Sequence, residues 1–269
     1  MTPAGDARTR KAAAAAVGQD DEMTTRMQKA DLTTAGLLLA DQWTTLRTWL
    51  GWLLDADDDD LWPVPAFPSV LPGFTVAELV AHVGRAMDAL AATRPAEPGT
   101  VPLTLAEYLG TYPDRATEIA RLTHEIAREI EPAPLPAVDA MAAAAFARLA
   151  ELGPEDCVVQ ARRAPITLSD MVVSRLIELV VHADDLARSV PHRPGQRPVD
   201  AAALDYVAEA LLAIVVVRGG WSLEIADPLL WVRLATGRTP YDVDQLARAL
   251  RPRFTSDSVP DLRGMLPLL

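Results

Sequence analysis

The sequence predicts a mainly α-helical protein, in which a four-helix bundle is followed by a small C-terminal domain of helices with a little β structure. Three observations support this fold class. Long segments carry apolar residues at helical spacing, helix-start signals stand at the head of several of them, and proline-rich stretches separate them. Half of the 269 residues are hydrophobic, so a substantial core can form.

Four long helical segments with loops between them predict an up-and-down type of bundle over residues 31–190. The first is residues 31–54, where leucine and tryptophan recur near the helical period. The second begins at Thr75, which forms a Thr-x-x-Glu capping box with Glu78. A last long helix begins at the similar Thr167–Asp170 motif and runs to about Val190. Between them we expect helices over 104–110, 113–130 and 136–152.

The remaining segments are expected to be leaders, loops and a second domain. Residues 1–30 lack the apolar core of a secretory signal and predict a mobile leader. The aspartate-rich run at 55–60 lacks the ligand spacing of an EF-hand and predicts a solvated loop. We expect residues 191–198 to form a linker and residues 199–269 to form a C-terminal domain. Within that domain we expect helices over 201–217 and 228–236, the latter ended by Gly237, with a short strand over 221–225.

Charge and cysteine content limit the class of partner. The formal net charge of −12 disfavours nucleic acid, because phosphate binding depends on clustered Lys and Arg. The most apolar run, residues 210–217, is too short to cross a bilayer, so no membrane partner is expected. The single cysteine, Cys157, rules out an internal disulfide and predicts a half-buried packing residue. A cytoplasmic location is the simplest expectation.

The sequence contains one constellation with metal-binding chemistry. Glu178 and His182 are four residues apart on one helix, so both side chains lie on the same face, within reach of one ion. His82, in another apolar helical segment, can supply a third ligand. Apolar residues flank the pair on almost all sides, and a buried Glu or His needs a partner. That partner is a metal ion, or the three side chains form a hydrogen-bonded network without metal.

Other polar residues near this motif have weaker signals. Asp185 lies almost one turn beyond His182, so it can orient a ligand histidine or be an ordinary polar residue of the helix. His124 has charged neighbours at helical spacing, which predicts a solvated face. His192 lies in the linker, where exposure is expected.

Three stretches resemble a known family: Leu61–Pro63, the segment from Gly73 to His82, and the segment from Glu178 to Leu186. Over about residues 35–190 the chain is similar to the mycothiol-dependent maleylpyruvate isomerases of actinobacteria, within the DinB-like metalloenzyme superfamily. The resemblance implies a DinB-like four-helix bundle that binds a divalent metal, usually zinc, through His82, Glu178 and His182. The 23 Arg against two Lys fit a GC-rich genome of the kind that encodes mycothiol.

The tail resembles a different domain. The segments from Asp227 to Arg238 and from Asp261 to Pro267 look like the end of a sterol-carrier-like domain, here in a shortened form. An arginine of that domain contributes to the active site in the isomerase. The candidate catalytic residues are therefore Arg233 and Arg238, with Asp185 from the bundle. Both arginines can alternatively be salt-bridge residues.

The resemblance implies a metal-bound mycothiol sulfur that attacks a small electrophilic substrate as a thiolate. The expected partners are thus a small-molecule thiol and that electrophile, with isomerisation, thiol transfer and hydrolysis as open reaction types. A homodimer is a candidate assembly. Two alternatives stay open: a noncatalytic protein that binds a small ligand or acts as a scaffold, and a closed structural metal site completed by Asp185 or by water-excluding side chains.

Overall fold

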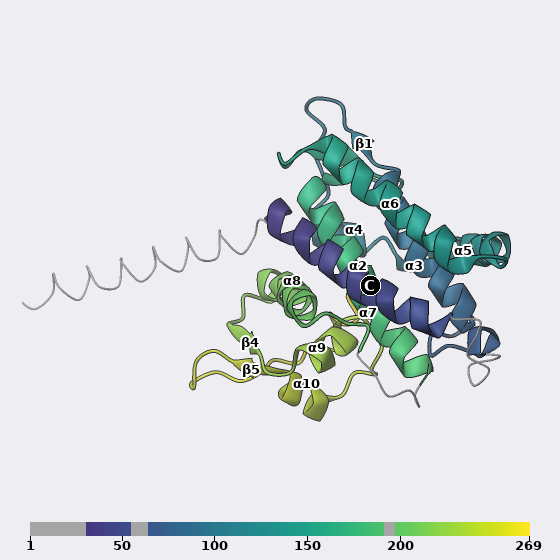
Figure 1. Cartoon of the computed structure of the whole chain (residues 1–269). Helices are drawn as coiled ribbons and strands as arrows, with labels where there is room; N and C mark the ends of the chain where they lie inside the picture. The colour runs from purple at the N-terminus through teal and green to yellow at the C-terminus, as the bar shows by residue number, and fades with distance from the viewer. Residues whose placement is uncertain (1–30, 55–63, 191–196) are drawn as a thin grey trace, which may run out of the picture.

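The computed structural model describes residues 31–54, 64–190 and 197–269, and it is mainly helical, as predicted (Figure 1). The expectations for the leader 1–30, for the aspartate run at 55–60 and for His192 in the linker lie outside the described residues. None of the helices in the described part of the chain is long and apolar enough to span a membrane.

The four predicted long helices are present. They are α2 (Leu32–Leu53), α3 (Val76–Ala91), α6 (Pro134–Leu152) and α7 (Leu168–Ser189). The segment between α3 and α6 holds α4 (Leu105–Leu109), α5 (Ala116–Ile130) and the 3₁₀ turn η3 (Pro113–Arg115), and a second 3₁₀ turn, η2 (Val64–Ala66), precedes α3. Helix α6 begins two residues earlier than expected, because its prolines occupy the first turn, where amide groups have no partner within the helix.

A small antiparallel sheet closes one end of the bundle and shows how the helices run. Its strands are β1 (Arg94–Pro95), β2 (Val158–Gln160) and β3 (Pro165–Thr167), in that order. Because β1 follows α3, β2 follows α6 and β3 precedes α7, helices α3 and α6 run toward the sheet and α7 runs away from it. Helix α2 is antiparallel to α6, since Gly36 lies beside Leu149 and Gly51 beside Leu135. Helices α2 and α7 therefore run away from the sheet, whereas α3 and α6 run toward it.

Local signals fix where the main helices start. Thr75 Oγ1 accepts a hydrogen bond from the amide of Glu78, and the Glu78 carboxylate accepts one from the amide of Thr75, at 2.7 Å, so the predicted capping box is confirmed. At the start of α7, Thr167 accepts from the amide of Asp170. Of the two hydrogen bonds expected for a second capping box, the structure contains this one.

Helix α7 lies at the centre of the molecule. Every residue from Met171 to Leu186 is buried, because α2 and α3 pack on one side of the helix and α8 (Ala201–Gly219) on another. The sequence prediction of a buried helix at this position is confirmed. Charged residues on α7 therefore have to find their partners inside the protein.

The C-terminal elements pack against the bundle. After α8 come β4 (Leu223–Ile225), α9 (Pro228–Ala235), α10 (Val243–Ala249) and β5 (Leu250–Pro252), and the two strands pair antiparallel. Figure 1 shows them gathered beside α2 and α7, away from α5 and α6. Gly237, at φ +71°, ends α9 as predicted, because the amides at 237 and 238 return to the last turn of the helix. A single hydrophobic core joins both parts, and the expected division into two domains stays a prediction.

The close contact between α3 and α6 generates a stability prediction. A methyl group at Gly84 would lie 2.8 Å from Met141 Sδ and from Val138 Cγ1. We expect Gly84→Ala to lower the free energy of unfolding by about 1–3 kcal/mol, because the two helices must separate to admit it. Urea denaturation monitored by circular dichroism measures this change.

Gly36→Ala is the matched control, because its added methyl group would meet Leu149 at 3.6 Å, an ordinary contact. There the gain in helix propensity should raise stability by about 0.5–1 kcal/mol. If Gly84→Ala is as stable as this control, the two helices do not approach as closely as described.

Candidate metal centre

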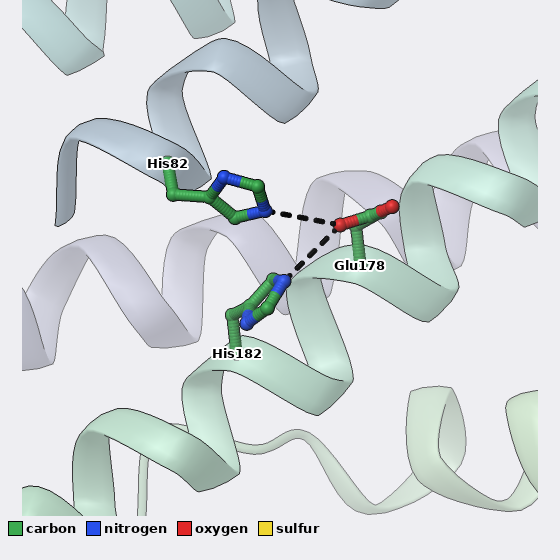
Figure 2. A group of neighbouring side chains, drawn as sticks. All are labelled: His82, Glu178 and His182. Atoms are coloured by element: carbon green, nitrogen blue, oxygen red, sulfur yellow. Dashed lines mark hydrogen bonds and ion pairs between the residues drawn. The ribbon is translucent and has the colours of Figure 1, made fainter. Parts of the chain in front are cut away.

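Three buried side chains meet between α3 and α7. His82 comes from α3, while Glu178 and His182 stand one turn apart on α7 (Figure 2). One Glu178 oxygen, Oε2, lies 3.2 Å from His182 Nε2 and 3.6 Å from His82 Nε2. One ligand atom from each residue can be chosen so that all three lie within 4.8 Å of one another. The structure thus brings together the three residues that the sequence nominated.

The hydrogen-bond network around His82 fixes which of its ring nitrogens carries the proton. Thr123 Oγ1 lies 3.1 Å from His82 Nδ1 and donates its own proton to the Ile119 carbonyl, at 2.9 Å. The hydroxyl must therefore accept from Nδ1–H. The lone pair of His82 Nε2 then faces the Glu178 carboxylate, so two acceptors stand opposite each other.

His182 is held in the same way from the other side. Its Nδ1 lies 3.1 Å from Asp185 Oδ2, and the same carboxylate oxygen accepts from Arg238 Nε at 3.2 Å. Nδ1–H therefore donates to Asp185, and Nε2 points to Glu178. A histidine oriented through Nδ1 by a carboxylate is the usual arrangement behind a metal-binding Nε2.

The environment sets the charge of each group. Burial lowers the pKa of His82 to about 4, and the nearby His182 adds to this effect, so His82 is neutral at pH 7. Burial opposes the charge of Glu178, but the hydrogen bond from His182 and the nearby Arg175 charge hold its pKa well below the usual range. Burial also lowers the pKa of His182, but the bonds to Asp185 and Glu178 outweigh this and raise it.

These three groups fit a divalent cation. Two imidazole nitrogens and one carboxylate oxygen are a donor set that catalytic zinc sites use, with further positions left open for a ligand. A metal-free network accounts for His182, whose proton can bridge to Glu178. It leaves the His82 Nε2 acceptor opposite a carboxylate, with no proton between them, and a cation removes this conflict.

Asp185 lies behind the cluster rather than inside it. Its Oδ2 faces Nδ1 of His182, the ring nitrogen on the side away from Glu178. In this position Asp185 can orient the histidine, but it does not supply the fourth ligand that a closed structural site would need. Asp185 is therefore not the fourth ligand of a closed structural site.

The two candidate arginines have different positions. Arg238, just after α9, donates to Asp185 and so reaches the cluster through that carboxylate. Arg233, on α9, makes two hydrogen bonds to Asp184, at 2.7 and 2.6 Å. Both arginines are salt-bridge residues in this structure, and Arg238 is the one connected to His182.

The expectation that His124 lies on a solvated face holds only in part, because 34 % of its side chain is exposed. Its ring is half-buried, because Nδ1 lies 2.8 Å from Glu78 Oε1 and the ring stacks on Phe74 with 5.3 Å between centroids. Phe74 also packs against His82. The partner of His124 is the capping glutamate of another helix, which spacing along its own helix does not reveal.

Sequence reasoning also missed Arg175, which is buried one turn before Glu178. Its Nη2 lies 3.9 Å from Glu178 Oε1 and donates to the Tyr112 hydroxyl, while Nη1 donates to the Ala86 carbonyl at 3.3 Å. A signal was available, since a lone arginine inside an otherwise apolar helix three residues before a nominated ligand requires an internal partner.

Comparison with known families agrees with this geometry. A family model described as the mycothiol maleylpyruvate isomerase N-terminal domain matches residues 39–187, more than half of the chain. The chain belongs to this family. The match contains all three clustered residues and stops before α8, so the sterol-carrier-like resemblance of residues 199–269 stays a prediction. No curated protein and no solved structure matches the chain.

For this member of the maleylpyruvate isomerase family, we expect about one zinc ion per chain after loading and desalting, measured by elemental analysis. His182→Ala should weaken zinc binding by at least about 100-fold, because loss of a ligand costs at least as much as loss of an orienting partner. His124→Ala is the control: it removes a histidine that contacts Phe74 but not the cluster. Equal zinc content in all three proteins would contradict the site.

Zinc binding should also depend on pH. In the metal-free protein His182 keeps a proton above the usual pKa of 6.5, and a cation must displace it. Affinity should therefore rise with pH through the pKa of His182 and level off above it. Near pH 6.5, binding should release on the order of one proton per chain. Calorimetry in two buffers of different ionisation enthalpy measures this release, and proton uptake would contradict the assignment.

Proposed function

We propose that this protein is a divalent-metal-dependent, mycothiol-using isomerase or thiol transferase that acts on a small electrophilic substrate. One observation carries the proposal. His82 Nε2, His182 Nε2 and the Glu178 carboxylate converge as acceptors, each imidazole held by a hydrogen bond on its far side. The chain that presents them belongs to a family whose description names mycothiol and maleylpyruvate.

The residues of the chain hold and orient the reacting groups. A bound divalent ion, for which zinc suits this donor set, would lower the pKa of a thiol beside it. Thr123 and Asp185 fix the imidazole rings, and Arg238 favours the ionised form of Asp185. The sole cysteine, Cys157, lies beside the small sheet at the end of the bundle. The proposal therefore takes the nucleophilic sulfur from mycothiol.

For an isomerase, the chemistry is a reversible addition. The thiolate sulfur bonds to one carbon of a cis double bond conjugated to a carbonyl, and the π electrons move to the carbonyl oxygen. Rotation about the resulting single bond is followed by cleavage of the same carbon–sulfur bond, which restores the thiolate and leaves a trans double bond. A thiol transferase would retain the carbon–sulfur bond and add a proton.

The family description favours isomerisation of maleylpyruvate as the first reaction to test. With zinc-loaded protein and mycothiol, we expect conversion of maleylpyruvate to its trans isomer. Proton NMR measures this conversion over time. Glu178→Gln should lower kcat/KM by at least about 100-fold, because it removes the shared anionic ligand. Arg121→Ala, which alters an exposed ion pair on α5, is the control.

Each other outcome points to a different function. Mycothiol consumption without isomerisation, measured by loss of free thiol with a panel of electrophiles, would favour a thiol transferase. Zinc binding without either reaction would favour the noncatalytic ligand-binding or scaffold alternative. The cytoplasmic location and the homodimer expected from the sequence stay predictions.

A further inference from the structure

Three arginines gather beside the metal centre, from three different elements. Arg85 stands one turn after His82 on α3, Arg175 one turn before Glu178 on α7, and Arg163 in the turn between β2 and β3. Arg163 and Arg175 lie close enough to Arg85 for their charges to act on it. Burial lowers the pKa of Arg85, and although Glu178 raises it, the positive charges of Arg163 and Arg175 lower it further.

Two of these guanidinium groups have buried donors that nothing satisfies. Within residues 31–54, 64–190 and 197–269, Arg85 Nε and Arg163 Nη1 are buried and have no hydrogen-bond partner. A buried donor without an acceptor costs about 1–3 kcal/mol, and more when it is charged. Such an arrangement is expected where a ligand supplies the missing acceptor.

Three carboxylates near these arginines are engaged elsewhere. Glu178 faces the two histidines. Asp88 accepts from Arg162 at 2.6 Å, and Glu118, which acts on Arg85 only at longer range, is paired with Arg115. The hydrogen bonds of Arg175 go to the uncharged Tyr112 hydroxyl, the Ala86 carbonyl and the Ser174 hydroxyl. Glu178, a nominated metal ligand, is the carboxylate that lies near Arg175 and acts on Arg85, and a bound cation would add to the positive charge of this region.

The position of Arg163 suits a planar anion. Its guanidinium carbon lies 3.8 Å from the centre of the Tyr112 ring and 5.5 Å from that of Tyr108, so the group packs against both rings. Stacking holds the guanidinium while leaving donors at its edge. Edge donors of arginine bind carboxylate and phosphate oxygens in pairs.

We propose that Arg85 and Arg163, with Arg175 behind them, form an oxyanion-binding site beside the metal centre that takes a carboxylate of the small substrate. This inference deepens the proposed function and rests on it for the identity of the ligand as a substrate. The site lies on the α3 side and the β2–β3 side of the cluster, whereas Arg238 approaches from the C-terminal region. The negative charge of the substrate would therefore be bound by arginines of the bundle rather than by Arg238.

The test uses maleate as the probe, a dicarboxylate without the reactive carbonyl. Calorimetric titration of the full-length protein, with and without zinc, should detect maleate binding, whereas its uncharged dimethyl ester should not bind. Arg85→Met and Arg163→Met should each weaken maleate binding by about 10–100-fold, because each removes a charged hydrogen-bond donor. Arg121→Met, on the exposed side of α5, should leave the affinity unchanged.

Thermal stability separates a binding role from a structural one. In the absence of any anion, Arg85→Met should melt at the same temperature as the wild type or higher, because it removes a buried donor without a partner. A variant that is destabilised while maleate affinity is unchanged would overturn the proposal. So would absence of maleate binding by the wild type, or inorganic phosphate that binds as tightly as maleate.

The outcomes also distinguish this site from the metal centre. Maleate binding that depends on Arg85 in a protein that takes up no zinc would support the oxyanion site and contradict the proposed function. Zinc binding with maleate affinity unaffected by Arg85→Met and Arg163→Met would leave the metal centre in place and overturn the oxyanion site.

Discussion

The burial of α7 on all sides is the constraint on which the rest of the structure depends. A helix buried from Met171 to Leu186 gains stability from its apolar residues, but each charged group on it must be compensated inside the protein. The compensation comes from different neighbours: Glu178 faces His82 of α3 and its own neighbour His182, and Asp184 faces the C-terminal region. The same helix thus carries the candidate metal ligands and fastens the tail to the bundle.

The sequence could predict those parts of the site that lie within one helix. Glu178 and His182 share a face because of helical geometry alone, and Thr75 with Glu78 defines the start of α3 locally. That His82 meets the pair requires α3 to pack antiparallel to α7, which periodicity does not determine. The sequence suggests His82 as the third ligand because it is the other histidine within an apolar helical stretch, and the family resemblance points to the same residue. In the structure His82 does lie beside Glu178 and His182.

The features that sequence reasoning missed depend on contacts between distant segments. His124 finds its partner 46 residues away, and Thr123 meets His82 from α5. Strands of two or three residues are too short to show alternation, so the sheet that brings Arg163 toward α3 and α7 gave no signal. The α10 and β5 segment was missed because its seven-residue helix and three-residue strand follow one another directly. Short elements of this kind form only because the surrounding core accepts them.

The neighbouring aspartates on α7 limit how freely this protein can be recombined. Asp184 and Asp185 accept hydrogen bonds from Arg233 and Arg238, both of which come from the C-terminal region. A bundle grafted onto an unrelated partner domain would keep two largely buried carboxylates but lose their counter-charges, and one of them directly holds His182. A chimera between relatives should therefore take Asp184 and Asp185 from the same parent as Arg233 and Arg238.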